Sequence, residues 1–579
     1  MDRFRRLDLP IVVTVLFAVL VTAMAGALHQ VAVQSECIQL VVASSQEKST
    51  LMQAAAAAFN AKRLVVGGRC INVNVNAVIS GAAEQALVDD GWKGQPGARP
   101  DVWVPSATTW LQLLDEHRSE HGRASLFARD KPAVSIMQSP LVIAMPEPMA
   151  RALGWPNNTK LGWKTIFDLA RDPRGWAVRE QKWGAFRLGK TNPYLSTSGL
   201  NTLINTYYAA SGKTSNLNAD DLSSPDVSTY VKDVESTVAH YGDTATTFLT
   251  NLRLAQQNSS QPYVSAVAVE EKEVWNYNVG NVSGDPSLQP ASRVPSPLLA
   301  AIYPSDGSIR ADHPYAVLTW ATRDKRAVSD MFLGYLLSSE RQVLFQAGGF
   351  RDSHGDAGSE ISTTNRLNPA NPIYVDLPTR DVIARIQASW DALRKPARIL
   401  IVADVSSSVG AKALADIKRP LADALVKLSP RDQVGLWQAP GRAQTVDELV
   451  AMGSLGGTQV AQIHNGILGL KVVDGQASLV DVVVASLVHL RQSYDPRSID
   501  AIVLLSPGTK ASLQVEALLQ DLSNQPTDQP IHVFTVHYGN HPDQDGTLRR
   551  IAGNSGAGFY DASSPGSFND LMIRVLSNF

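Results

Sequence analysis

Three oxygen-bearing side chains alternate directly after an apolar run in the C-terminal third of the chain. Asp404, Ser406 and Ser408 follow ILIVA and form the pattern D-x-S-x-S. A carboxylate and two hydroxyls on alternate residues of a turn can face one hard divalent cation, and Mg²⁺ accepts such oxygens while keeping part of its water shell. The pattern predicts a site for Mg²⁺, or for Mn²⁺ or Ca²⁺, with a position left open for a partner's carboxylate. The alternative is that these side chains only brace the turn through hydrogen bonds.

A second set of hydroxyl groups stands where strand-like segments give way to helix-like ones. At such turns the backbone N–H groups are free and the helix dipole is positive, so hydroxyls there can line a site for a small polar or anionic solute. The candidates in the first part of the chain are Ser44, Ser45 and Ser106. Any one of them taken alone is better explained as a helix N-cap.

These serines depend on an alternation of strands and helices. The apolar run 37–43 and the alternating run 71–80 have strand patterns, and residues 52–63 between them have a helical pattern. Ser44 and Glu47 stand at the spacing of a capping box, which predicts that a helix begins there. The alternation predicts an α/β domain with a largely parallel sheet.

The two cysteines of the chain, Cys37 and Cys70, each open a strand-like run. Adjacent parallel strands would bring them close enough for a disulfide, which persists in an oxidising compartment. The alternative is a pair of free buried thiols. Their spacing fits no metal site.

An uncharged segment near the N-terminus indicates in which cellular compartment the bulk of the chain lies. Leu9–Leu28 reads LPIVVTVLFAVLVTAMAGAL, and as a helix it would rise about 30 Å, enough to cross a bilayer core. Three arginines precede it, so the positive-inside rule keeps residues 1–8 in the cytoplasm and the bulk of the chain outside. We expect a single-pass membrane anchor. The alternatives are a signal peptide cleaved near residues 23–27, which gives the same compartment, and a helix buried in a soluble core.

The composition limits the class of protein and the kinds of partner that the chain can have. The 579 residues are enough for about three or four domain-sized units. A hydrophobic share of 44% and a charged share of 18% are typical of a globular protein. The net charge of −2 without any charge block argues against nucleic acid and acidic membrane surfaces as partners.

Residues 37–360 resemble a bacterial extracellular solute-binding protein of the two-lobed periplasmic type (type 2). The phrases that carry the resemblance follow one another along this region: LVVASSQEKSTLMQAAAAAFN, PDVWVPSATTWLQLL, SPLVIAMPEPMARALGW, LGWKTIFDLA, GKTNPYLSTSGLNTL, AIYPSDGSIRADHPYAVL and QAGGFR. No single phrase is decisive, but their order over the region makes the resemblance specific.

That resemblance implies a ligand cleft between two lobes, near the early turns of each. The positions that match these turns are Ser44, Ser45, Ser106, Thr191, Ser196 and Ser198. Relatives of this type bind oxyanions, metal ions or small organic solutes. The neutral hydroxyls at these positions favour a small solute or an oxyanion.

Residues 397–579 resemble a von Willebrand factor A (VWA) domain, after a linker at 361–396 with its own helical pattern. Besides ILIVADVSSSVG, the phrases DQVGLWQ, AIVLLSPG, HVFTVHYG and LRRIAGNSGAGFYDASSPGSFNDLMIRVL carry the resemblance. It implies a Rossmann-like fold with a central, mostly parallel sheet. In that family D-x-S-x-S supplies part of the metal-ion-dependent adhesion site (MIDAS).

The rest of the family's metal site departs from the pattern. Its remote threonine corresponds to Ala477, which has no ligand oxygen, although Ser478 stands one place away. Its late aspartate corresponds to Pro507. The predicted metal site is therefore incomplete, with Asp404, Ser406 and Ser408 as its intact half.

The two resemblances predict a membrane-anchored extracytoplasmic binding protein of the bacterial envelope. Its solute-binding-like domain would recognise a small ligand, and its VWA domain would engage a protein partner. One alternative is the receptor of an ABC-type solute uptake system. A second, an envelope enzyme, is disfavoured because the sequence has neither a G-x-S-x-G elbow nor H-E-x-x-H.

Overall fold

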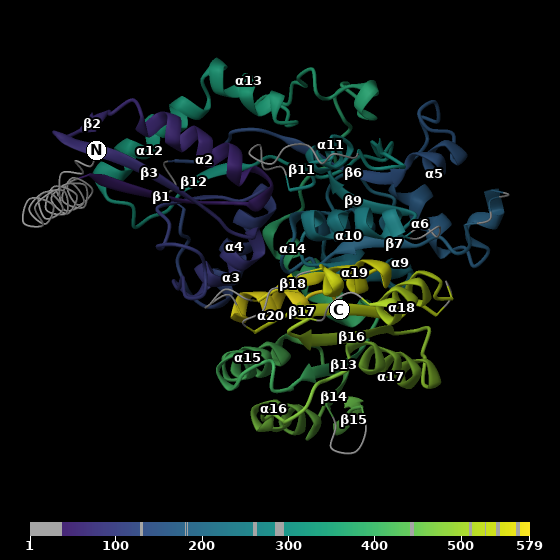
Figure 1. The fold of residues 1–579 in the computed structure, drawn as a ribbon. Coiled ribbons are helices and arrows are strands. Elements are labelled where there is room, and N and C mark those ends of the chain that lie inside the picture. The colour runs from purple at the N-terminus through teal and green to yellow at the C-terminus, as the bar shows by residue number, and fades with distance from the viewer. Residues whose placement is uncertain are drawn as a thin grey trace, which may run out of the picture.

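The computed structural model describes residues 37–127, 131–179, 181, 183–258, 263–283, 294–440, 445–508, 512–526, 529–539, 543, 545–562 and 568–579. The predicted anchor Leu9–Leu28 lies outside these residues. Within the part that is described, no helix combines the length and the apolar character needed to cross a bilayer. The chain is an α/β protein with three six-stranded sheets, each flanked by helices (Figure 1).

The first sheet forms the first lobe, with the strand order β2-β3-β1-β4-β12-β5. Strands β3, β1 and β4 are parallel neighbours, as the sequence predicts. Side chains of β1 alternate, so Leu40 and Val42 pack with α2 and α12 while Ala43 packs with α3 and α4. The strands are β1 (Ile38–Ser44), β2 (Val65–Val66), β3 (Arg69–Ala77), β4 (Val102–Val104), β5 (Val134–Ser135) and β12 (Pro314–Val317), and the helices are α2 (Gln46–Asn60), α3 (Ser80–Val88), α4 (Thr108–Glu120), α12 (Arg323–Leu336) and α13 (Ser339–Ala347).

The second sheet forms the second lobe, with the order β10-β6-β9-β7-β8 and β11 paired to β6. Strands β9, β7 and β8 run parallel, whereas β6 is antiparallel to β9 and β10. The strands are β6 (Ser139–Pro146), β7 (Leu188–Thr191), β8 (Val238–Gly242), β9 (Ala266–Glu270), β10 (Leu299–Ile302) and β11 (Arg310–Ala311). The helices are α5 (Glu147–Ala152), α6 (Trp163–Arg171), α7 (Thr197–Ser211), α8 (Ala219–Ser223), α9 (Pro225–Ser236), α10 (Ala245–Asn258) and α11 (Glu271–Asn278).

The chain crosses between the lobes along neighbouring strands. Strand β5 pairs with β12 in the first lobe, and the chain then enters β6 of the second lobe. It returns from β11, which pairs with β6, to β12. His313 lies in this second crossing, between β11 and β12. Two short connecting segments, residues 136–138 and 312–313, join the lobes there and form the hinge between them.

The third sheet belongs to the C-terminal unit and has the order β15-β14-β13-β16-β17-β18. All neighbours are parallel except β14 and β15. Helices α17, α18 and α19 pack on one face and α15, α16 and α20 on the other. The strands are β13 (Ala397–Asp404), β14 (Gln433–Ala439), β15 (Asp447–Ser454), β16 (Ile499–Ser506), β17 (His532–His537) and β18 (Phe559–Asp561), and the helices are α15 (Ala411–Ala424), α16 (Gln459–Gly469), α17 (Leu479–Gln492), α18 (Leu513–Ser523), α19 (Thr547–Asn554) and α20 (Phe568–Leu576).

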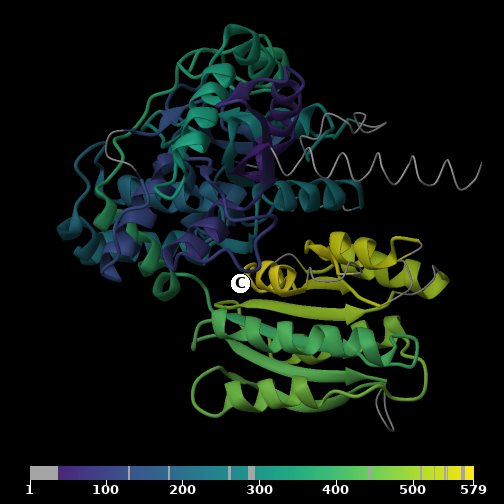
Figure 2. The same cartoon turned by 90° about the vertical axis from the view of Figure 1, so that its left-hand side faces the viewer.

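The C-terminal unit packs directly against the second lobe. The chain's yellow C-terminal segment lies between the third sheet and the lobes (Figure 2). The backbone N–H of Tyr241, in edge strand β8, donates to the carbonyl of Asn578 at 3.1 Å, and Arg574 pairs with Asp243 at 2.6 Å. This contact covers a sheet edge that would otherwise expose unpaired backbone groups.

The segment expected as a linker is also packed. Its helix, α14 (Arg380–Leu393), matches the predicted helical stretch and lies against α4 and α7. Trp390 contacts the rings of Tyr194 and Tyr241, both from the second lobe. The helix therefore belongs to the core between the lobes and the C-terminal unit.

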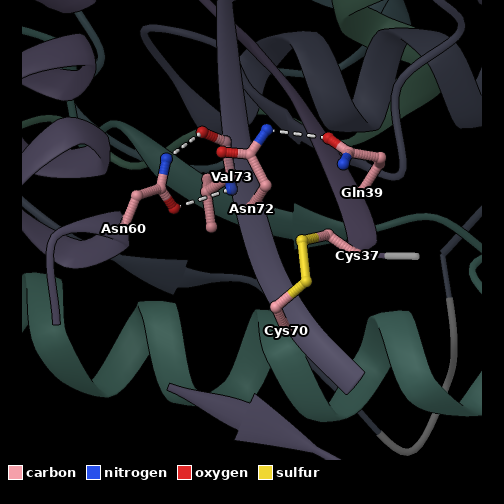
Figure 3. Close-up of a disulfide and its surroundings, with 6 residues drawn as sticks. All are labelled: Cys37, Gln39, Asn60, Cys70, Asn72 and Val73. Atoms are coloured by element: carbon pink, nitrogen blue, oxygen red, sulfur yellow. Dashed lines mark hydrogen bonds between the residues drawn. A yellow bond between two sulfur atoms is a disulfide. The ribbon is translucent and has the colours of Figure 1, made fainter. Parts of the chain in front are cut away.

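The disulfide expected in the first lobe is present. Cys37 and Cys70 are bonded, with their Cα atoms 4.5 Å apart (Figure 3). The parallel register of β1 and β3 pairs Ile38 with Ile71, which places the two preceding residues side by side. The prediction from adjacent parallel strands is confirmed.

Candidate functional site

A pocket lies between the two lobes and is lined by the first residues of helices from both. The first lobe contributes the starts of α2 and α3, with Ser106 from the turn before α4. The second lobe contributes the starts of α7, α10 and α11. Helix starts present free N–H groups and the positive end of the dipole. The free volume of the pocket is about 40 Å³, room for only a few water molecules.

Direct hydrogen bonds hold the lobes closed around this pocket. The indole N–H of Trp110, in α4, donates to the hydroxyl of Thr197 at the start of α7, at 2.7 Å. The hydroxyl of Thr109 donates to the side-chain oxygen of Asn201 at 3.1 Å. All four side chains are buried, so these bonds join the lobes away from solvent.

The residues predicted to bind a solute fall into two groups. Ser106, Ser196 and Ser198 line the pocket. Ser44, Ser45 and Thr191 lie behind its wall: Ser44 donates to the carbonyl of Ser45 at 3.3 Å, and Thr191 donates to the hydroxyl of Ser196 at 2.9 Å. The structure thus brings the six residues to one place, with three of them facing the cavity.

Glu47 lies in the pocket and does not have the helix-capping role that the sequence predicts for it. The capping box expected from Ser44 and Glu47 is not formed, because α2 begins one residue later, with Ser45 as its N-cap and no side-chain cap bond. The carboxylate of Glu47 instead accepts hydrogen bonds from Ser45 and, at 2.7 Å, from Ser106. Burial alone would raise its pKa, but Lys48, His313 and the serine hydroxyls lower the pKa to about 2.

Two further carboxylates face the pocket from the start of α11. Glu270 is the N-cap of that helix, and Glu273 is in its first turn. Burial, Glu47 and Glu273 raise the pKa of Glu270 well above its usual value. Burial and Glu47 raise the pKa of Glu273 to about 8. The phrase AVAVEEKEVW, an apolar run followed by acids, is the sequence signal that could have pointed to them.

Two buried lysines lie beside these acids. The ammonium of Lys48 donates to the hydroxyl of Ser45 and to the carbonyl of Pro105, and it lies 3.4 Å from Glu47. Burial lowers the pKa of Lys48, and it lowers the pKa of Lys272 to about 7. The cleft is therefore a network of buried charges, unlike the neutral hydroxyl site that the sequence predicts.

His313 completes the network from the hinge. Its Nδ1 lies 3.6 Å from a carboxylate oxygen of Glu47, and its Nε2 lies 3.4 Å from one of Glu270. The side chain is fully buried, and its backbone N–H donates to the carbonyl of Ser106 at 2.9 Å. Burial and the Lys48 ammonium hold the pKa of His313 well below its usual value. No feature of the sequence pointed to this histidine.

The D-x-S-x-S turn forms a second candidate site in the C-terminal unit. Asp404 ends β13, and its carboxylate accepts from the backbone N–H of Ser406 at 3.0 Å. The hydroxyls of Ser406 and Ser408 lie 2.7 Å apart. Burial raises the pKa of Asp404 against the lowering effect of these bonds. Ser506, at the end of neighbouring β16, donates to Asp404 at 3.5 Å, a partner that sequence reasoning missed.

Ala477 and Ser478, the two residues considered for the remote ligand of this site, lie just before α17. The backbone N–H of Ser407 donates to the carbonyl of Gly475 at 3.4 Å, so the loop before α17 lies against the turn. Ala477 offers no side-chain oxygen. The hydroxyl of Ser478 instead caps α17 by accepting from the N–H of Asp481 at 3.4 Å. The substitute role considered for Ser478 is therefore disfavoured by its capping bond.

The region that contains the first two sheets matches a known protein family. A family model described as bacterial extracellular solute-binding protein matches residues 40–351. No curated protein gives a significant match.

Parts of the chain are also similar to solved structures, among them the following three. The periplasmic binding protein AfuA from Actinobacillus pleuropneumoniae, with fructose-6-phosphate bound, is 13% identical, with 62% of this chain and 99% of that chain covered and a TM-score of 0.40. Iron-bound HitA from Pseudomonas aeruginosa is 14% identical, with 61% and 99% covered and a TM-score of 0.38. The VWA domain of SpRpn10 is 14% identical, with 30% and 93% covered and a TM-score of 0.25.

Proposed function

Because the chain belongs to the family of bacterial extracellular solute-binding proteins, we propose that it acts outside the cytoplasm as a receptor for a small polar solute held between its two lobes. The observation that carries this proposal is the pocket at which helix starts from both lobes meet. Solute and lobe closure are coupled in such an arrangement, since a ligand that contacts both lobes favours the closed form by its differential affinity.

The chemistry of the pocket restricts the solute. Glu47, Glu270 and Glu273 line it, and the hydroxyl of Ser106 already donates to Glu47. An oxyanion in this pocket would lie beside the ionised carboxylate of Glu47, and that like charge disfavours its binding despite the free N–H groups of the helix starts. A neutral or positively charged solute that offers donors to carboxylates fits these groups.

A panel of small solutes tests this proposal through the shift in Tm that each produces. A solute that binds only the folded chain raises Tm with concentration. We expect the shift to fall in Ser198→Ala and to persist in Ser512→Ala, because Ser198 lines the pocket whereas Ser512 caps α18 in the C-terminal unit. A panel in which no solute shifts Tm would contradict the receptor function.

For the C-terminal unit we propose a VWA fold that engages a protein partner. In chain order its strands are arranged 3-2-1-4-5-6, and the strand order reverses between β13 and β16. Ligands of open α/β sheets bind at the carboxyl ends of strands at this switch point. Asp404 ends β13 and Ser506 ends β16, so the D-x-S-x-S turn lies at the expected place.

The oxygens of this turn fit a hard divalent cation in part. Asp404 with Ser406, Ser408 and Ser506 would supply one carboxylate and three hydroxyls, to which Mg²⁺ or Mn²⁺ adds water. Titration of the chain with Mg²⁺ and Mn²⁺ by calorimetry, with Asp404→Ala as the comparison, tests the proposal. Heat of Mg²⁺ binding that persists unchanged in Asp404→Ala would exclude this turn as the site.

Anchoring by Leu9–Leu28 stays part of the proposal. It would hold both binding units at the outer face of a membrane. A receptor of an ABC-type uptake system is the alternative, favoured by the family match over the first two sheets. A permease that co-purifies with the chain would support it over a role in protein interaction alone.

A further inference from the structure

Three buried side chains meet where the two lobes and the hinge come together. Glu47 comes from α2 of the first lobe, Glu270 from the end of β9 in the second lobe, and His313 from the crossing between β11 and β12. One carboxylate oxygen from each glutamate and one ring nitrogen all lie within 4.8 Å of one another. Two carboxylates and an imidazole are a common ligand set for first-row transition metals.

The histidine and one of the acids have unmet polar groups. Neither ring nitrogen of His313, nor Oε2 of Glu270, has a hydrogen-bond partner among the described residues. Both side chains are almost completely buried, at 0% and 4% exposed. Buried polar atoms are rarely left without a partner, because each loses its bonds to water. These atoms point toward one another and leave coordination positions unfilled.

The excess of negative charge in the cluster also favours a bound cation. Glu47, Glu270 and Glu273 interact electrostatically with two ammonium groups, those of Lys48 and Lys272. Glu271 is already paired with Arg351 in a bidentate ion pair at 2.9 Å. Three carboxylates against two ammonium groups leave an excess of negative charge when all are ionised. A bound cation would offset this excess and favour the ionised forms of Glu270 and Glu273.

The size of the pocket suits an ion that keeps part of its water shell. Its free volume of about 40 Å³ has room for only a few water molecules, and Glu47 and Glu270 form part of its wall. The side chain of Glu47 is 12% exposed, so the cluster is open to the pocket.

We propose that the solute of the interlobe pocket is a divalent transition-metal cation, held by Glu47, Glu270 and one ring nitrogen of His313. Zn²⁺, Mn²⁺ and Co²⁺ fit this nitrogen-containing set better than Mg²⁺ or Ca²⁺, which prefer oxygen alone. Ligand atoms of one such ion lie up to about 4.3 Å apart, so a small inward movement of the three groups completes the site. The inference rests on the proposed receptor function and names its ligand class.

Binding of the cation would fix the closed form. Its ligands come from both lobes and the hinge, so the open form cannot offer the same set. The cation therefore binds the closed form more tightly and shifts the lobes toward it.

The experiment is a calorimetric titration of the chelator-treated full chain with Zn²⁺, Mn²⁺, Co²⁺, Mg²⁺ and Ca²⁺. We expect a saturable transition-metal site that is retained in Asp404→Ala and whose affinity falls at least about tenfold in Glu270→Gln and in His313→Asn. Asparagine suits position 313 because its φ is 41°, a left-handed conformation that asparagine tolerates. The absorption of bound Co²⁺ and its loss in the variants give a second readout, and circular dichroism confirms that the variants fold.

Matched controls make the same chemical changes on the surface. Glu516→Gln alters an exposed ion pair with Arg550, and His121→Asn alters an exposed imidazole. Both should leave the transition-metal affinity unchanged. Equal affinity in Glu270→Gln, His313→Asn and the parent would overturn the assignment, as would a parent that binds none of the transition metals.

The solute panel separates failure of this inference from failure of the receptor function. An organic solute that raises Tm in the presence of chelator, with no transition-metal binding, overturns the cation and leaves the receptor. If neither cations nor organic solutes bind, both proposals are wrong.

Discussion

The backbone N–H of Gly81, in α3 of the first lobe, donates to the carbonyl of Leu195 in the second lobe at 3.1 Å. The approach is so close that a Cβ atom on Gly81 would lie 2.0 Å from the carbonyl oxygen of Tyr194. That neighbour is backbone, so it cannot rotate away. Glycine at this position allows the lobes to close on the pocket.

Substitution Gly81→Ala should therefore keep the lobes apart. We expect a larger radius of gyration by small-angle X-ray scattering and weaker binding of any interlobe ligand, with each lobe still folded. Gly334→Ala is the matched control, because Gly334 also lies within a helix but its Cβ would meet nothing within 4 Å. Alanine there should stabilise α12 by about 0.5–1 kcal/mol. An unchanged radius in Gly81→Ala would show that the closed form tolerates the methyl group.

The disulfide should stabilise the first lobe because it restricts the conformations of the unfolded chain. Cys37 and Cys70 are 33 residues apart, and a cross-link of that span restricts the unfolded state by about 3–4 kcal/mol. Replacing both cysteines by alanine should lower the free energy of unfolding by that order in urea titrations. Addition of a reductant should lower the stability of the parent to the same level and leave the double variant unchanged. A parent insensitive to reductant would contradict the prediction.

The interface between the second lobe and the C-terminal unit should weaken in acid. His240 and His532 are buried there with their rings 4.9 Å apart. Burial lowers the pKa of His240 to about 4 and that of His532 to about 3. The unfolded histidines bind protons near pH 6.5, so the folded chain is favoured fully above that pH and loses stability as pH falls toward 4.

Each histidine contributes a slope of up to about 1.4 kcal/mol per pH unit between pH 6 and 4. His240→Phe should remove about half of the combined slope in urea titrations across this range. His121→Phe, at an exposed position, should leave the slope unchanged. Parallel pH profiles for His240→Phe and the parent would contradict the prediction.

Breaking the ion pair of Glu271 and Arg351 should lower the free energy of unfolding substantially. Both side chains are 0% exposed, and two hydrogen bonds of 2.9 Å join them. Glu271→Gln leaves an uncompensated buried guanidinium, so we expect a loss of about 3–5 kcal/mol in the free energy of unfolding. Glu516→Gln breaks an exposed pair with Arg550 that solvent screens, so it should cost far less. Equal losses would show that burial does not set the cost.

Much of the fold is determined by local patterns in the sequence. The alternation of INVNVNAVIS matches β3, the helical pattern at Arg380–Leu393 matches α14, and the strand-like openings at Cys37 and Cys70 predict the disulfide. Hydrophobic periodicity and turn residues act over a few residues, so such features can be identified without knowing which segments meet. The position of Ser106 at a helix start follows from the same local signals, whereas Ser196 and Ser198 were predicted from the resemblance to the solute-binding family; all three residues line the pocket.

The chemistry of the pocket was decided only by the tertiary structure. The sequence places Glu47, Glu270 and His313 far apart, and nothing local indicates that the hinge brings them within 4.8 Å. Two of the serine hydroxyls that suggested a neutral site, those of Ser45 and Ser106, donate to Glu47. In the same way, only the sheet order sets Ser506 beside Asp404 while the cap of α17 engages Ser478. A side chain's type is fixed by the sequence, but its partners, and with them its charge, depend on which distant segments pack together.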